Sequence, residues 1–194
     1  MDGYSIFKEG LNVASLLSGP LIAIFAFKAL NQIKVTKEIA DKQAKMESYK
    51  LTMDACRNFS EVVIPSIDEL TDLIESNSID VLGKSKARIE DHRIKVEYFT
   101  EYDFNENDFE KIKPHATKVI NSISVLSYFL LSDLSDEYLA YENLALVYCS
   151  TVEMLAPLIS ELPIVRGRSP IEEIYVLWKE RLDSDRMIRE IAKI

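Results

Sequence analysis

GLNVASLLSGPLIAIFAF, residues 10–27, decides how this chain of 194 residues is organised. The stretch holds eighteen consecutive uncharged positions between Glu9 and Lys28. A helix rises about 1.5 Å per residue, so the stretch would cover roughly 27 Å, close to the thickness of a bilayer's hydrocarbon core. We therefore predict a short tail over residues 1–9, a transmembrane helix over 10–29 and a cytoplasmic helical domain over 30–194.

The lysines around this stretch predict its orientation. Only Lys8 precedes it, whereas a series of lysines follows it: Lys28, Lys34, Lys37, Lys42 and Lys45. Because positive charge gathers on the cytoplasmic side of a membrane, we expect the N-terminus outside and the body in the cytoplasm. Cys56 and Cys149 agree with a reducing compartment, since they match no disulfide framework or zinc spacing. A secretory signal and a buried helix of a soluble bundle stay open as alternatives.

The polar and small residues of the stretch share one face of the predicted helix. Asn12, Ser15, Gly19 and Ala23 stand at helical spacing, and the last three form a small-x-x-x-small ladder. Such ladders let membrane helices approach closely or line a narrow passage, so we expect self-association. Pro20 removes a backbone donor, which predicts either a gating hinge or a tolerated irregularity.

The remainder of the sequence predicts an all-α fold. After Lys28, glycine is scarce and the hairpin dipeptides Asn-Gly and Asp-Gly do not occur. The span is expected to continue into a long helix whose apolar stripe faces either neighbouring subunits or the core, with a bend at Pro65. Its stripe comprises Ile33, Ala40, Ala44, Leu51, Ala55, Phe59 and Val62. Further helices are predicted over 81–99, 107–131 and 135–162, and a last one from Ser169-Pro170-Ile171-Glu172.

The sequence lacks the motifs of the common enzyme classes. It has no glycine-rich phosphate loop, no G-x-S-x-G and no H-E-x-x-H, and His92 and His115 stand apart from any metal-ligand spacing. We therefore predict that the chain is not an enzyme and has no metal or cofactor. Its net charge of −9 argues against a duplex DNA ligand.

Three groups of basic residues are candidates for binding an anion. Arg166 and Arg168 bracket Gly167 just before the last helix, where two guanidinium groups could grip a phosphate. The lysines near the membrane, Lys50 among them, suit anionic lipid. A third group is expected to be spread around the predicted helix over 81–99, and so to form a solvated face: Lys84, Lys86, Arg88, Arg93 and Lys95.

The layout of the chain resembles the small membrane effectors of bacterial anti-phage defence systems, and is similar to the membrane effector of Hailong-type systems. The segment from Asn12 to Phe27 carries this resemblance. It implies a homo-oligomeric ion channel of the bacterial inner membrane that acts in abortive infection and is restrained by single-stranded DNA oligomers from a partner nucleotidyltransferase. It also implies an aromatic constriction among Phe7, Phe25 and Phe27, with the DNA-binding groups among the basic residues above.

Our first expectation is therefore a gated pore built from several copies, with a tetramer as the working assembly. The alternative is a membrane-anchored adaptor that docks a partner protein through the aromatic and acidic stretch YFTEYDFNENDF, residues 98–109. A soluble helical regulator is the third possibility.

Overall fold

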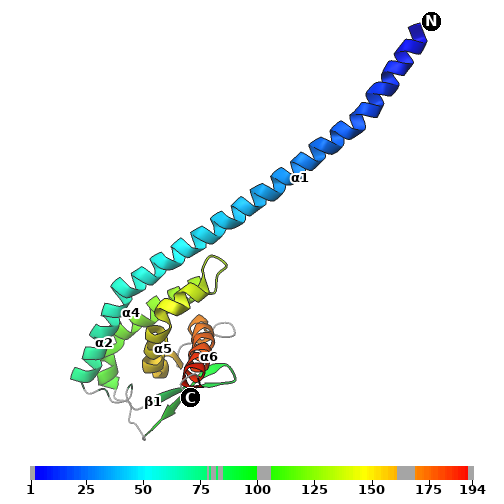
Figure 1. Cartoon of the computed structure of the whole chain (residues 1–194). Coiled ribbons are helices and arrows are strands. Elements are labelled where there is room, and N and C mark those ends of the chain that lie inside the picture. The colour runs from blue at the N-terminus through cyan, green and yellow to red at the C-terminus, as the bar shows by residue number, and fades with distance from the viewer. Residues whose placement is uncertain are drawn as a thin grey trace. The chain divides into compact units, whose positions relative to one another are not determined.

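The structure is a computed structural model that describes the backbone of residues 3–77, 79, 82, 85–99, 106–160 and 169–191. Side chains are described from Phe27 onward, except those of 78, 80, 81, 83, 84, 100–109, 161–168 and 191–194. The described chain is mostly helical (Figure 1), and it divides into two units, Met1–Met46 and Glu47–Ile194.

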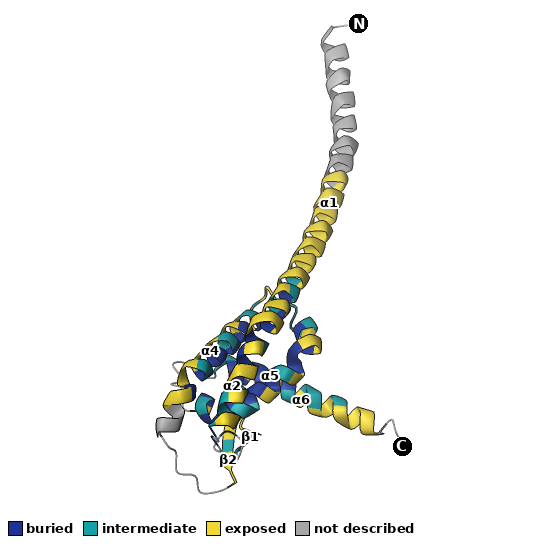
Figure 2. Ribbon diagram, turned by 90° about the vertical axis from the view of Figure 1, so that its left-hand side faces the viewer, coloured by how far each residue is buried: buried dark blue, intermediate teal, exposed yellow. Residues whose placement is uncertain are grey.

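The first unit is part of helix α1 (Gly3–Asn58). The stretch predicted to span the membrane lies within this helix, but its side chains are outside the described residues. From Phe27 to Met46 every side chain is exposed (Figure 2). Several of them are large and apolar, with more than half of their surface exposed: Phe27, Leu30, Ile33, Val35, Ile39 and Met46.

A π-helical turn, η1 (Phe59–Val63), separates α1 from α2 (Ile64–Ser76). The N–H of Ile64 donates to the carbonyl of Phe59, five residues earlier. Pro65 follows at once; it has no N–H to donate and its ring crowds the preceding turn, so the backbone widens there. The π-helical turn therefore stands where Pro65 predicted a bend.

The all-α prediction is confirmed in that the described chain is mostly helical, but the prediction of a helix over 81–99 is wrong. Strands β1 (Ser85–Glu90) and β2 (Arg93–Tyr98) form an antiparallel hairpin. Its turn residues Asp91 and His92 have φ of 52° and 57°, a left-handed conformation that Asp and His adopt more readily than most other residues. Positive φ at both central positions is typical of a type I′ hairpin turn, here made without glycine.

The three remaining described helices confirm the sequence analysis closely. They are α4 (Glu106–Leu130), α5 (Glu137–Ser160) and α6 (Pro170–Ile191). Helix α5 is the centre of the second unit, because it packs against α4, α6 and both strands. Trp178 of α6 and Tyr148 of α5 are fully buried and meet edge to face at 5.0 Å between ring centroids.

The start of α6 is fixed by Glu172, as its capping sequence predicted. One carboxylate oxygen accepts the Ser169 N–H at 3.2 Å, and the other accepts the Ile94 N–H of β2 at 3.3 Å. A single buried carboxylate therefore caps α6 and holds the hairpin against it.

The hairpin turn gives a direct test of this fold. Replacing His92 with Gly relieves a left-handed conformation that costs a non-glycine residue about 1 kcal/mol, so the melting temperature should rise by about 2–4 °C. Glu90→Gly, one position before the turn in extended β1, is the matched control and should lower it. Equal destabilisation by both variants in thermal denaturation would contradict the turn.

Candidate functional sites

The predicted pore residues belong to α1. Most of them have side chains outside the described residues: Phe7, Asn12, Ser15, Gly19, Pro20, Ala23 and Phe25. The side chain of Phe27 is described and is 65% exposed. Lys84, Arg166 and Arg168 also lie outside the described residues. Of the predicted docking stretch over 98–109, the described side chains are Tyr98 and Phe99, and both are exposed.

The hairpin gathers the basic residues that a helix would have spread. Strand residues alternate between two faces, so Lys86 and Arg88 of β1 share the outer face with Arg93 and Lys95 of β2. The other face carries apolar side chains toward the core, with Ile94 buried. The expectation of a dispersed set is thus corrected, because it depended on the wrong secondary structure.

Two glutamates share this outer face and partly neutralise it. Glu97 lies opposite Lys86, and Glu90 lies opposite Arg93. Glu97 also forms an ion pair with Arg88, 2.7 Å from Oε2 to Nε. The middle row, however, sets Arg88 opposite Lys95. The face therefore carries four basic and two acidic groups, and Glu97 partly neutralises the central pair through Arg88.

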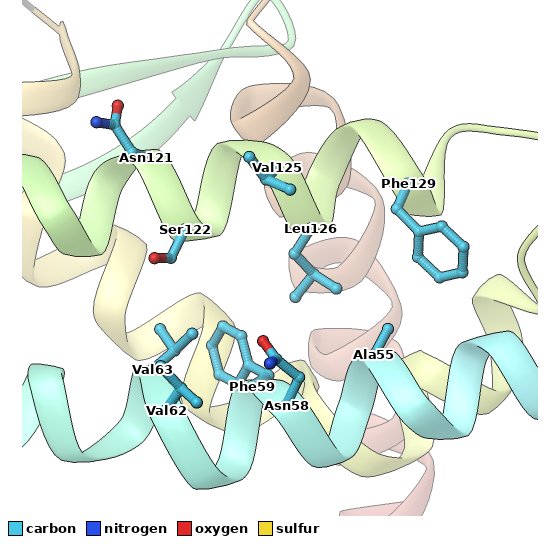
Figure 3. Close-up of a pocket in the computed structure, with 10 residues that line it drawn as sticks. All are labelled: Ala55, Asn58, Phe59, Val62, Val63, Asn121, Ser122, Val125, Leu126 and Phe129. Carbon is cyan, nitrogen blue, oxygen red and sulfur yellow. The ribbon is translucent and has the colours of Figure 1, made fainter.

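A second candidate site is an apolar groove of about 520 Å³ between the end of α1, η1 and α4 (Figure 3). Phe59 of the π-helical turn and Leu126 of α4 point toward one another across it. Val125 on its rim is 70% exposed and Val62 is 50% exposed. Asn58, Asn121 and Ser122 add polar groups to the lining. Such a surface suits an apolar helix of a partner, and the sequence analysis did not find it.

A polar cluster joins α5 to α6. Glu137 accepts hydrogen bonds from the indole of Trp178 and, at 3.1 and 3.2 Å, from both terminal nitrogens of Arg181. The guanidinium of Arg181 lies 4.5 Å from the ring centroid of Tyr141, whose hydroxyl donates to Asp185 at 2.7 Å. The hydrogen-bond donors and acceptors of these groups are paired with one another. We therefore interpret the cluster as a structural link that holds α5 to α6.

Hydropathy alone marks a further candidate span that the sequence analysis passed over. Among the described residues, α5 is the one helix long and apolar enough to cross a membrane, and 56% of its apolar window is buried inside the protein. Its neighbours are the other helices and the hairpin, so its apolar character is explained by the core.

The described side chains offer little reactive chemistry. Within this part of the chain, no three His, Cys, Asp or Glu residues are grouped as metal ligands; His92 lies in the hairpin turn and His115 on α4. Burial, followed by the charge of Glu153, raises the pKa of the Cys149 thiol to about 12. Burial also raises the pKa of Cys56.

Comparison with known proteins gives no relative: no family model, no curated protein and no solved structure matches this chain.

Thiol reactivity tests the packing around α5. In the Cys56→Ser variant at pH 8, modification of Cys149 should be about a thousandfold slower than that of a free thiol, because the thiolate is the reacting form and burial suppresses it. The same variant in denaturant is the control and should react at the free-thiol rate. Fast modification of the native protein would show that α5 is not packed as described.

Proposed function

We propose that this chain is a single-span membrane protein whose N-terminal helices bundle, as a homo-oligomer, into a gated ion pore. The body then lies in the cytoplasm and senses a ligand or partner. A role in bacterial anti-phage defence, and restraint by single-stranded DNA, are the parts of this proposal that depend on the resemblance. The observation that supports the proposal is that large apolar side chains on α1 between Phe27 and Met46 expose half or more of their surface.

An isolated helix in water is marginal, and helices in proteins depend on burial of an apolar face. Phe27 ends the uncharged stretch and Leu30 lies three residues beyond it, so lipid can cover them. Ile39 and Met46 lie farther along, among charged residues, where neighbouring copies of the same helix are the natural cover.

The apolar residues of this segment form two stripes. Val35, Ile39 and Met46 follow one line at helical spacing, and Ile33, Ala40 and Ala44 follow another. At 3.6 residues per turn the two stripes lie about 140° apart around the helix. A helix in a closed ring contacts one neighbour on each side, so two separate stripes favour a ring over a simple pair.

In the proposed bundle, Ser15, Gly19 and Ala23 pack the helices, and Asn12 supplies a polar ring. Phe25 or Phe27 obstructs the passage, and Pro20 provides the hinge at which the helix changes shape.

Replacing Gly19 with Leu tests the bundle. The added side chain separates helices that must approach closely, which costs about 1–2 kcal/mol per contact, so ion flux should fall about tenfold or more. The measurement is potassium release from liposomes containing the full chain, with and without single-stranded oligonucleotides. Ser18→Leu, the same change off the stripe, should leave flux unchanged. If the liposomes release no potassium under any of these conditions, the proposed pore is contradicted.

The groove between η1 and α4 favours a second candidate, a membrane-anchored adaptor, because its exposed Val62 and Val125 suit a docked partner helix. Exchanging residues 10–27 for an unrelated polyleucine span separates the two functions. A pore loses its ability to depolarise cells, whereas an adaptor keeps its activity. Val125→Asp should disable the adaptor, and Leu146→Asp, at a 74% exposed position on α5, is the control.

A further inference from the structure

We infer that the second units of two copies contact one another head to tail, with the outer face of the β1–β2 hairpin of one copy against helix α2 of the next. This inference rests on the proposed homo-oligomer, and names the surfaces through which its copies meet. Both surfaces belong to the second unit. Helix α2 packs against α4, whereas the hairpin packs against α5 and α6, so different elements carry the two surfaces (Figure 1).

Helix α2 carries an exposed stripe of three carboxylates, Asp68, Asp72 and Glu75, which we call the acidic stripe. At 3.6 residues per turn they lie within about 60° of one another around the helix. The sequence has no Lys or Arg over residues 58–83. Within the described part of the chain, none of the three carboxylates forms an ion pair. The stripe is therefore a concentrated negative surface without a cation of its own.

The acidic stripe lowers the stability of α2 in an isolated copy. Asp68 and Asp72 are four residues apart, and Asp72 and Glu75 are three apart, so each pair brings two like charges together on the helix surface. Glu75 also lies in the last turn, where the helix dipole has its negative end. Cations that approach from outside relieve both effects. A second protein surface with fixed positive groups would therefore stabilise the helix.

The outer face of the hairpin has the complementary charge. Its four basic and two acidic groups give it a net charge of +2. Arg88 already pairs with Glu97. Lys86, Arg93 and Lys95 are exposed, and among the residues that the structure describes they form no ion pair. These three cations are available to the carboxylates of another copy.

The two surfaces also have similar lengths. A strand rises about 3.3 Å per residue, so the hairpin face from Lys86 to Glu90 extends roughly 13 Å. The acidic stripe from Asp68 to Glu75 rises about 10 Å along α2. One helix face can therefore lie along the hairpin with its carboxylates within reach of the basic side chains.

A second copy is the occupant that satisfies both surfaces. A nucleic acid or another polyanion would meet the basic face and leave the acidic stripe unpaired, and a basic partner would do the reverse. Contact between two different surfaces of identical chains repeats from copy to copy and closes into a ring, in agreement with the two stripes of α1. Exposed ion pairs are weak singly, so this contact would orient copies that α1 already holds together.

The test cross-links two versions of the full chain that are co-expressed and extracted together in mild detergent. One carries His92→Cys in the exposed hairpin turn, and the other carries Ser76→Cys at the exposed end of α2. The native thiols are buried. A short bismaleimide should join the two versions into a covalent dimer, with a yield that falls in high salt. Either version expressed alone should give little product, because like surfaces do not meet.

Charge reversal shows whether these surfaces make the contact. Lys86→Glu with Lys95→Glu in both versions should lower the cross-linking yield about tenfold or more, because attraction becomes repulsion at two positions. Adding Asp68→Lys and Asp72→Lys to the same chains restores opposite charges across the contact, and should recover the yield. Lys95→Glu alone should give a smaller loss, and thermal denaturation of each variant shows whether it still folds.

Arg186→Glu with Arg189→Glu makes the same charge change at the exposed end of α6, and is the control that should leave the yield unchanged. If no cross-link forms in a particle whose mass is that of several chains, or if the yield ignores every reversal, this inference is overturned and the proposed homo-oligomer stands. A particle with the mass of one chain overturns the proposed function as well.

Discussion

Uncovered apolar surface on α1 is the constraint from which the account of this protein follows. Phe27, Ile33, Ile39 and Met46 each expose half or more of their side chain, and within the first unit no other element lies against them. Water is a poor environment for such a helix, because its stability in proteins comes from a buried face. We propose that lipid covers the apolar side chains near the uncharged stretch and that further copies of the chain cover those beyond it, because charged residues begin at Lys28.

The second unit satisfies its own packing. Trp178, Tyr148 and Tyr175 fill the core around α5, and Glu172 binds the start of α6 to the hairpin through two backbone N–H groups. Within this unit, the Thr52 hydroxyl near the end of α1 accepts the Asp136 N–H at 2.8 Å, directly before α5. This hydrogen bond links the start of α5 to the last turns of α1, a connection that the proposed sensing role would use.

The sequence predicted the helices well and the hairpin not at all, for identifiable reasons. Ser169, Pro170 and Glu172 are local start signals, and they placed α6 because capping acts over a few residues. The hairpin is also local, but its turn uses Asp91 and His92 in place of glycine, and its alternating pattern is short. Because of that error, the sequence analysis placed the basic residues around a helix, whereas the strands bring four of them onto one face. The groove could not be predicted from the sequence, because Phe59 and Leu126 are brought together only by the tertiary packing of α4 and η1.

The most direct test of the central claim is the mass of the detergent-extracted particle, measured by light scattering with the detergent contribution subtracted. If neighbouring copies cover the two stripes of α1, the particle contains a defined number of chains, three or more. The double variant Ile39→Lys with Ala40→Lys then lowers the protein mass of the particle. A wild-type particle with the mass of one chain, still folded by circular dichroism, would contradict the account, because one helix cannot enclose a passage.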